Sequence, residues 1–170
     1  MTHSLRITAL AAVLTLGCSG AFAAQDDDFV EDASAKGVAE VEAGKLAQEK
    51  DSSADVKAFA DMMVKDHTQA NIKLKSIAAS KKLKVSDSAQ LMDKAKSMIL
   101  ELRNSKPFDK AYANNQVKAH EATIDLFEKE VANGKDTDLT AFATATLPKL
   151  KEHLAHAKAL AQAHGGDAGE

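Results

Sequence analysis

Three histidines of this chain occupy positions that a helical repeat of apolar residues would direct inward. His67 lies four residues after Met63 and three before Ala70, on a stripe of apolar side chains at helical spacing. His120 lies on a second such stripe, and His153 lies at the edge of a third. A buried imidazole needs a hydrogen-bond partner or a metal ion, because its ring nitrogens lose contact with water. The pattern therefore predicts a polar site inside a helical protein.

Glu42 offers a carboxylate near the same level. It lies four residues from both Val38 and Leu46, so one rotation of its predicted helix would point it inward. Val41 also belongs to the apolar face of this helix, which leaves the rotation open. Glu42 and the three histidines each fall near the middle of a long predicted helix. Helices of similar length that pack side by side share a midplane, so we expect the four side chains to form one layer.

Two interpretations of this layer stay open. In the first, three imidazole nitrogens and one Glu42 oxygen bind a single transition metal ion, namely Zn, Fe, Mn, Cu or Ni. In the second, the imidazoles hydrogen-bond to Glu42 and to hydroxyl groups and fix the register of the helices. Each histidine also has an acidic sequence neighbour that could accept a hydrogen bond from the ring nitrogen that does not bind the metal: Asp66, Glu121 and Glu152. A di-iron centre is disfavoured, because none of these histidines belongs to a Glu-x-x-His motif.

The elements that would position the layer are helices, since the chain is rich in Ala, Lys and Leu and has only two prolines. The periodicity predicts helices over about 29–50, 54–81, 87–104, 108–132 and 138–163. Ser52 to Asp55 resembles a capping box, and Asp136 or Thr137 would cap the last helix. We therefore predict an all-α protein, a ferritin-like four-helix bundle with a short extra helix in the crossover between the second and fourth helices. A plain up-down bundle with a short extra helix is the alternative.

The N-terminus is typical of a targeting segment. Arg6 precedes an apolar run over 7–16 that is too short to cross a bilayer, and Ala21-Phe22-Ala23 matches a cleavage site. We predict a signal peptide over 1–23, a helical bundle over 24–163, a flexible tail over 164–170 and a periplasmic location. The stretch that ends at Cys18 loosely matches a lipoprotein box, so a lipid anchor to the outer membrane is the alternative.

Charge and motifs exclude several classes of function. The formal net charge is −3 and no long run of basic residues occurs, which argues against a nucleic-acid partner. We expect no transmembrane segment, and the sequence indicates no particular protein partner. Nucleophile, phosphate-loop and zinc-protease motifs are also absent from the sequence, so the chain shows no sign of a catalytic residue.

Five segments together resemble the secreted bacterial domain of unknown function 4142 family, whose members are often labelled putative outer-membrane proteins. The segments are Glu40-Val41-Glu42 with Gly44-Lys45-Leu46-Ala47, Val56 to Thr68, Phe108-Asp109 with Tyr112, Gln116 to His120, and Leu147 to Leu154. The resemblance covers nearly all of the predicted mature chain and implies a ferritin-like bundle with a crossover. It implies no activity.

The resulting expectation is a non-enzymatic periplasmic ferritin-like bundle, with Glu42, His67, His120 and His153 as the candidate ligands of one transition metal ion. A metal-dependent oxidoreductase that acts on oxygen or peroxide is one alternative. A structural or envelope-stress interaction protein, in which the histidines only hydrogen-bond, is the other.

Overall fold

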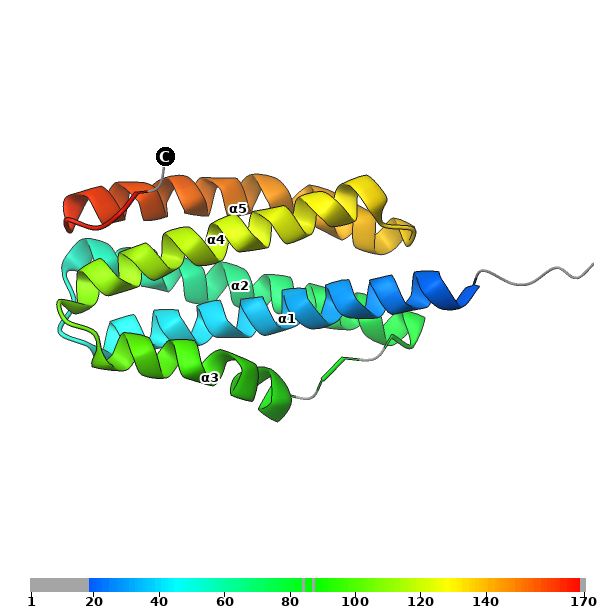
Figure 1. The fold of residues 1–170 in the computed structure, drawn as a ribbon, viewed down its shortest axis with the longest axis horizontal. Helices are drawn as coiled ribbons and strands as arrows, with labels where there is room; N and C mark the ends of the chain where they lie inside the picture. Colours follow the sequence, from blue (N-terminus) through cyan, green and yellow to red (C-terminus); the bar gives the residue numbers. More distant parts are fainter. Residues whose placement is uncertain (1–18, 84, 87, 169–170) are drawn as a thin grey trace, which may run out of the picture.

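The computed structural model describes residues 19–83, 85–86 and 88–168, and all regular elements among them are α-helices. The helices are α1 (Ser19–Glu49), α2 (Ala54–Lys81), α3 (Ser88–Asn104), α4 (Phe108–Asn133) and α5 (Thr137–Ala163) (Figure 1). Most predicted ends agree with these within one or two residues. The exception is α1, which begins well before the predicted residue 29.

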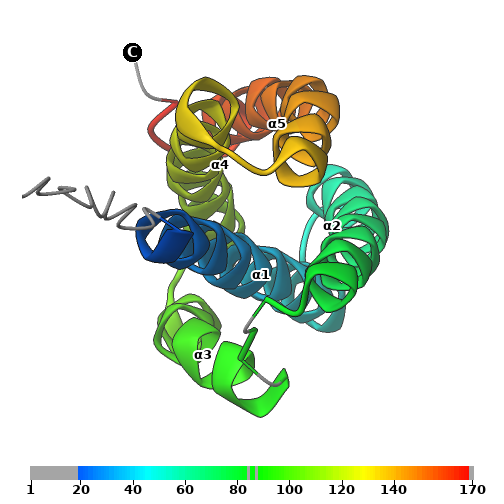
Figure 2. The ribbon, with the colours of Figure 1, turned by 90° about the vertical axis from the view of Figure 1, so that its right-hand side faces the viewer.

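The four long helices form two antiparallel hairpins, α1 with α2 and α4 with α5 (Figure 1). The two members of each hairpin pack closely along their length, whereas α2 meets α5, and α1 meets α4, over a smaller surface. The connection through α3 runs back along α1, so that α4 starts at the same end of the bundle as α2 and runs parallel to it (Figures 1 and 2). The space between the hairpins is therefore bounded by all four long helices.

Local side-chain chemistry explains several helix ends. Asp136 caps α5, since its carboxylate accepts hydrogen bonds from the backbone N–H groups of Asp138 and Leu139 at 2.9 and 3.1 Å. The capping box predicted at the start of α2 is wrong: the Ser53 side chain makes no capping hydrogen bond. The backbone N–H of Ser53 instead donates to Asp109 of α4 at 3.0 Å, which ties the two helix starts together.

Close contact with α2 fixes the rotation of α1 about its axis. Gly44 lies against α2 so closely that a Cβ atom there would come within 2.7 Å of the Val64 side chain and 3.0 Å of the Ala60 carbonyl oxygen. Ala43 and Ala47 are fully buried on the same side. The predicted stripe of α1 was rotated from this face: several of its members are only partly buried, among them Ala35, Val38 and Val41.

The apolar core consists of two clusters, one towards each end of the bundle. One contains Met63, Val117 and Ala157, and the other contains Leu74, Ile124 and Leu150. On each of α2, α4 and α5, a histidine lies between a residue of the first cluster and a residue of the second. The histidines thus form a polar layer that divides the core.

The structure can be compared with the predictions of a signal peptide, a flexible tail and the absence of a transmembrane segment. Residues 1–18, which hold Cys18 and most of the predicted signal peptide, lie outside the described residues. The segment predicted as a flexible tail contacts the bundle: His164 lies 2.9 Å from Asp55, and the backbone N–H of Asp167 donates to Asn114 at 2.7 Å. In the part of the chain that the structure describes, no helix has both the length and the apolar character needed to cross a membrane.

Candidate metal centre

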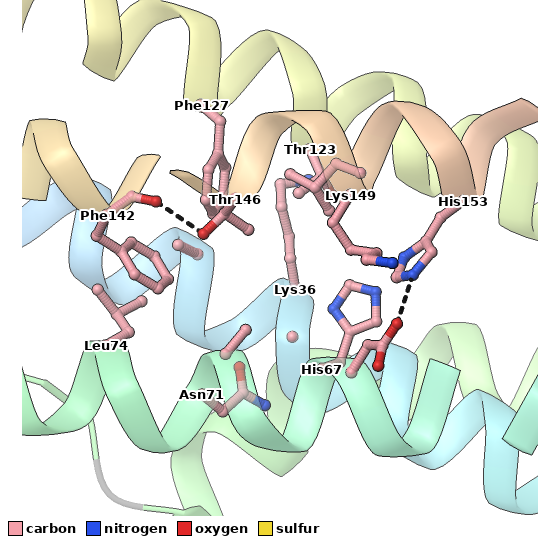
Figure 3. Close-up of a pocket in the computed structure, with 15 residues that line it drawn as sticks. Lys36, His67, Asn71, Leu74, Thr123, Phe127, Phe142, Thr146, Lys149 and His153 are labelled. Carbon is pink, nitrogen blue, oxygen red and sulfur yellow. Dashed lines mark hydrogen bonds and ion pairs between the residues drawn. The ribbon is translucent and has the colours of Figure 1, made fainter. Parts of the chain in front are cut away.

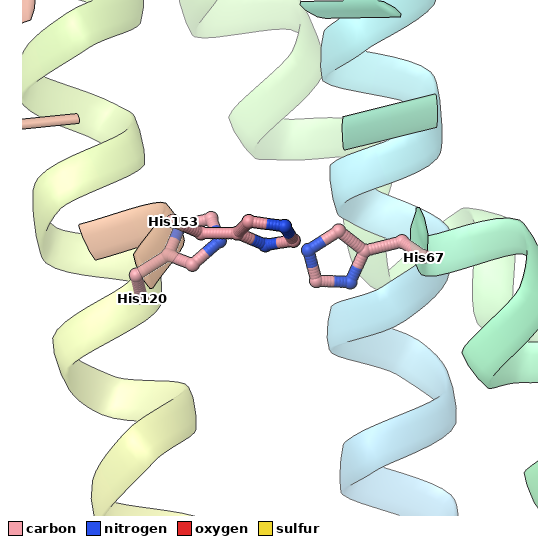
Figure 4. A group of neighbouring side chains, drawn as sticks. All are labelled: His67, His120 and His153. Atoms are coloured by element: carbon pink, nitrogen blue, oxygen red, sulfur yellow. The ribbon is translucent and has the colours of Figure 1, made fainter. Parts of the chain in front are cut away.

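His67 of α2, His120 of α4 and His153 of α5 meet at the centre of the bundle (Figure 4). Their ring centroids are 5.4 to 5.5 Å apart in all three pairs. One ring nitrogen of each histidine lies within 4.8 Å of the corresponding nitrogens of the other two. The side chains are 6%, 1% and 1% exposed, respectively. The three predicted histidines therefore form one buried cluster, which we call the histidine triad.

Hydrogen bonds on the outer side of the triad fix two of the rings. His120 Nδ1 lies 2.9 Å from the backbone carbonyl oxygen of Gln116. Because a carbonyl oxygen can only accept a hydrogen bond, this nitrogen carries the proton. His153 Nε2 donates to the Asp66 carboxylate at 3.0 Å (Figure 3). In the neutral imidazoles, His120 Nε2 and His153 Nδ1 are then left with free lone pairs. Both atoms are buried without a hydrogen-bond partner, and so is His67 Nε2.

Burial favours the neutral forms of His67 and His153. It lowers the pKa of His67 from 6.5 to about 3, and the neighbouring His120 and His153 lower it further by charge repulsion. Burial also lowers the pKa of His153, although the hydrogen bond to Asp66 opposes this effect. At neutral pH, His67 and His153 are therefore in the neutral form, which is the form in which imidazole binds metal ions.

The acidic neighbours of the histidines behave differently from one another. Asp66 bonds to His153 of another helix and not to the adjacent His67. Glu121 forms an ion pair with Lys158 at 3.2 Å, and Glu152 forms one with Lys149 at 2.8 Å. Only Asp66 of the three predicted acidic residues therefore supports the triad.

Glu42 does not join the triad, which corrects the predicted fourth member of the layer. Its side chain is 27% exposed and bonds to Lys45 at 2.8 Å on the surface of α1. The buried carboxyl of α1 is Glu40, which is only 3% exposed. Two residues along a helix correspond to a rotation of about 200°, so the two carboxylates lie on nearly opposite sides of α1. The contact at Gly44 decides which of them faces inward.

Glu40 and Gln116 form a second buried polar group that the sequence reasoning missed. Burial raises the pKa of Glu40, while electrostatic interaction with His120, the nearby Gln116 amide and the charge of Lys36 lower it in part. Glu40 Oε2 and both polar atoms of the Gln116 amide are buried without a partner. Two signals in the sequence could have found them: Gln116 lies one helical turn before His120, and Glu40 shares a face with Gly44 and Ala47.

A cavity of about 60 Å³ lies beside the triad (Figure 3). His67 and His153 form part of its wall, and the apolar part includes Leu74, Phe127 and Phe142. Its polar lining residues are Lys36, Asp66, Asn71, Thr123, Thr146 and Lys149. The triad is thus buried but has space next to it.

A comparison with protein families gives a match over residues 11–160 to DUF4142, which is described as a domain of unknown function. The chain belongs to the DUF4142 family. The match covers most of the chain and includes all three histidines of the triad, and it confirms the family resemblance expected from the sequence. Neither the curated proteins nor the solved structures searched contain a match to the chain. Because the description of DUF4142 names no activity, the function of this member has to be argued from its own residues.

Proposed function

We propose that this DUF4142 protein binds one transition metal ion through His67, His120 and His153. One observation carries the proposal: histidines from three helices bring ring nitrogens within 4.8 Å of one another, and each of the three has a buried ring nitrogen without a hydrogen-bond partner. On His120 and His153, the opposite ring nitrogens donate to an oxygen. Metal-binding histidines in proteins show the same division, in which one nitrogen binds the metal and the other donates to a carbonyl or carboxylate.

The three donors favour some metals over others. Imidazole suits Zn, Cu, Fe and Ni, whereas Mn²⁺ prefers carboxylate and water oxygens. The absence of Glu42 from the triad therefore moves the preference towards Zn²⁺ and Cu²⁺. In a tetrahedral zinc site the nitrogens are about 3.4 Å apart. The triad nitrogens lie within 4.8 Å of one another, so zinc binding would require them to move closer together by up to about 1.4 Å.

A purely hydrogen-bonded layer explains the triad less well. Among the described residues, no hydrogen bond joins any two of the three histidines, and none is formed by His67. A layer that served only to fix helix register would satisfy its buried polar atoms, because each unsatisfied one costs about 1–3 kcal/mol. A metal ion would satisfy all three nitrogens at once.

We further propose a ferritin-like arrangement and a location outside the cytoplasm. The two hairpins joined through α3 support the first, because this order of helix directions is that of a ferritin-like bundle. The charged start, apolar run and cleavage motif of residues 1–23 support the second. Mass spectrometry of the exported protein tests both forms of processing, since a mature chain beginning at Ala24 contradicts a lipid anchor at Cys18.

Metal analysis of the untagged protein, purified from the periplasm without chelators, tests the metal proposal. We expect one equivalent of metal per chain and its loss in a His67→Ala/His120→Ala double variant. His156→Ala is a matched control, because His156 is an exposed histidine on the same helix as His153. Circular dichroism confirms that the variants remain helical.

Substoichiometric metal that stays the same in the double variant would contradict the proposal. If the variants fail to fold, titration of metal-free wild-type protein with Zn²⁺ decides instead, since the proposal requires a one-to-one complex. If the metal-loaded protein consumes peroxide or oxygen, the result would favour the alternative function, a metal-dependent oxidoreductase, over metal binding alone.

A further inference from the structure

We infer that the cavity beside the triad is the binding site of a small monoanion that coordinates the metal from the cavity side. The inference rests on the proposed metal site and adds a ligand to it.

The cavity lies on one side of the triad along the bundle axis. Thr123, three residues after His120, lines the cavity, whereas Gln116, four residues before His120, lies on the opposite side with Glu40. His67 and His153 belong to the triad and to the cavity wall at the same time. An ion held by three imidazoles keeps at least one coordination position for another ligand. The cavity provides empty space for that ligand next to His67 and His153.

The volume of the cavity limits the size of the ligand. Drug-sized molecules need pockets of about 300–1,000 Å³. The cavity measures about 60 Å³, which is well below this range. The volume therefore favours a ligand of a few heavy atoms over a drug-sized organic molecule.

The charge around the cavity selects an anion. A divalent metal with three neutral imidazoles leaves a local charge of about +2. Lys36 extends from α1 into the cavity (Figure 3), and although its charge also acts on Glu40 one turn along α1, it forms no ion pair within the described part of the chain. Asp66 is the acidic residue of the lining, and its carboxylate accepts a hydrogen bond from His153 Nε2. The Lys36 ammonium is therefore placed to neutralise the far end of an anion whose other end binds the metal.

The ligand can enter between the two hairpins. The cavity is lined by Asp66 and Ala70 of α2 and by Thr146 and Lys149 of α5, all of which are partly or largely exposed. The contact between α2 and α5 is sparser than the contacts within each hairpin. This seam gives solvent a short route to the triad.

The test uses the full-length protein loaded with one equivalent of Cu²⁺ and titrated with azide, a linear monoanion of three atoms. We expect azide to produce a new charge-transfer absorption band and a change in the electron paramagnetic resonance spectrum. Lys36→Met should weaken azide binding at least tenfold without changing the copper stoichiometry. Lys45→Met is the matched control, because Lys45 is an exposed lysine of the same helix that lies outside the cavity. Ala70→Leu should block azide by filling the cavity.

The possible failures are distinguishable. If copper does not bind, both the metal proposal and the inferred ligand site fail. If copper binds in a one-to-one complex that the His67→Ala/His120→Ala variant loses, but azide leaves its spectra unchanged, only the ligand site fails. Azide binding of equal strength in the wild type, Lys36→Met and Ala70→Leu would also overturn it, because the anion would then bind from another side.

Discussion

Asp66 bonds to His153, a residue 87 positions away, and not to His67 beside it. The 3.0 Å contact joins α2 to α5, and therefore one hairpin to the other. It also sets the tautomer of His153, so that Nδ1 carries the lone pair that faces a metal. A single carboxylate thus serves both the packing of the hairpins and the chemistry of the triad.

Replacing Asp66 by Asn should weaken metal binding by about 10–100-fold, because His153 loses the charged acceptor that fixes its ring. Isothermal titration of metal-free protein with Zn²⁺ measures the change. Glu152→Gln is the control: Glu152 is next to His153 in sequence but bonds to Lys149 on the surface. Equal affinities of the two variants would contradict the role assigned to Asp66.

Replacing His67 by Leu should stabilise the metal-free protein by about 1–3 kcal/mol while abolishing metal binding. His67 has a buried nitrogen without a partner, and an apolar side chain of similar size removes that cost. Urea unfolding in the presence of a chelator gives the free energy of unfolding. A clear destabilisation would show that His67 forms a structural contact, as the hydrogen-bonded interpretation of the layer requires.

The metal-free protein should lose stability as the pH falls below 6.5. The pKa of His67 is about 3 in the folded chain, below its ordinary value of 6.5, so at mildly acidic pH the unfolded chain binds a proton that the folded chain does not. The slope reaches about 1.4 kcal/mol per pH unit for each such histidine, and His153 acts in the same direction.

Glu40 has the opposite effect on stability. Burial raises its pKa, so its contribution is present below the ordinary value of 4.5 and is lost as the pH rises through the folded-state pKa. Unfolding curves between pH 7.5 and 5 for the wild type, His67→Leu and Glu40→Gln separate the two effects. The His67→Leu curve should be flatter than that of the wild type. An equal slope would contradict the neutral, buried state of His67.

Metal should stabilise the fold and its removal should destabilise it. The triad takes one histidine from the α1–α2 hairpin and two from the α4–α5 hairpin, so a bound ion links the two. At a free metal concentration 100 times the dissociation constant, the added stability is about 2.7 kcal/mol. Thermal unfolding with Zn²⁺ and with a chelator measures this difference. His120→Ala should show none of it.

Replacing Gly44 by Val should destabilise the protein by about 1–3 kcal/mol, because α1 cannot move away from α2 without losing contacts along the hairpin. The first atom added already comes within 3.0 Å of the Ala60 carbonyl oxygen. Chemical unfolding measures the loss, and Ala122→Val at an exposed position of α4 is the control. Since the same contact sets the rotation of α1, the environment of Glu40 should also change.

The sequence by itself determined the helices and the three histidines. The spacing of apolar residues places His67 and His120 on buried stripes whatever the neighbouring helices are, because helical periodicity is a local property of the chain. The similar position of the histidines along their helices was also visible in the sequence. Their meeting in one layer follows once those helices pack side by side.

Only the tertiary structure decided which carboxylates take part. Glu40 and Glu42 fit two rotations of the same helix, and the choice depends on how closely Gly44 approaches α2. The bond from Asp66 to His153 depends on the distance between two helices, which no spacing within one helix reveals. The cavity likewise exists because four long helices leave space between two hairpins. Rotation and separation of helices are set by side-chain packing across the whole bundle, and local sequence patterns do not contain them.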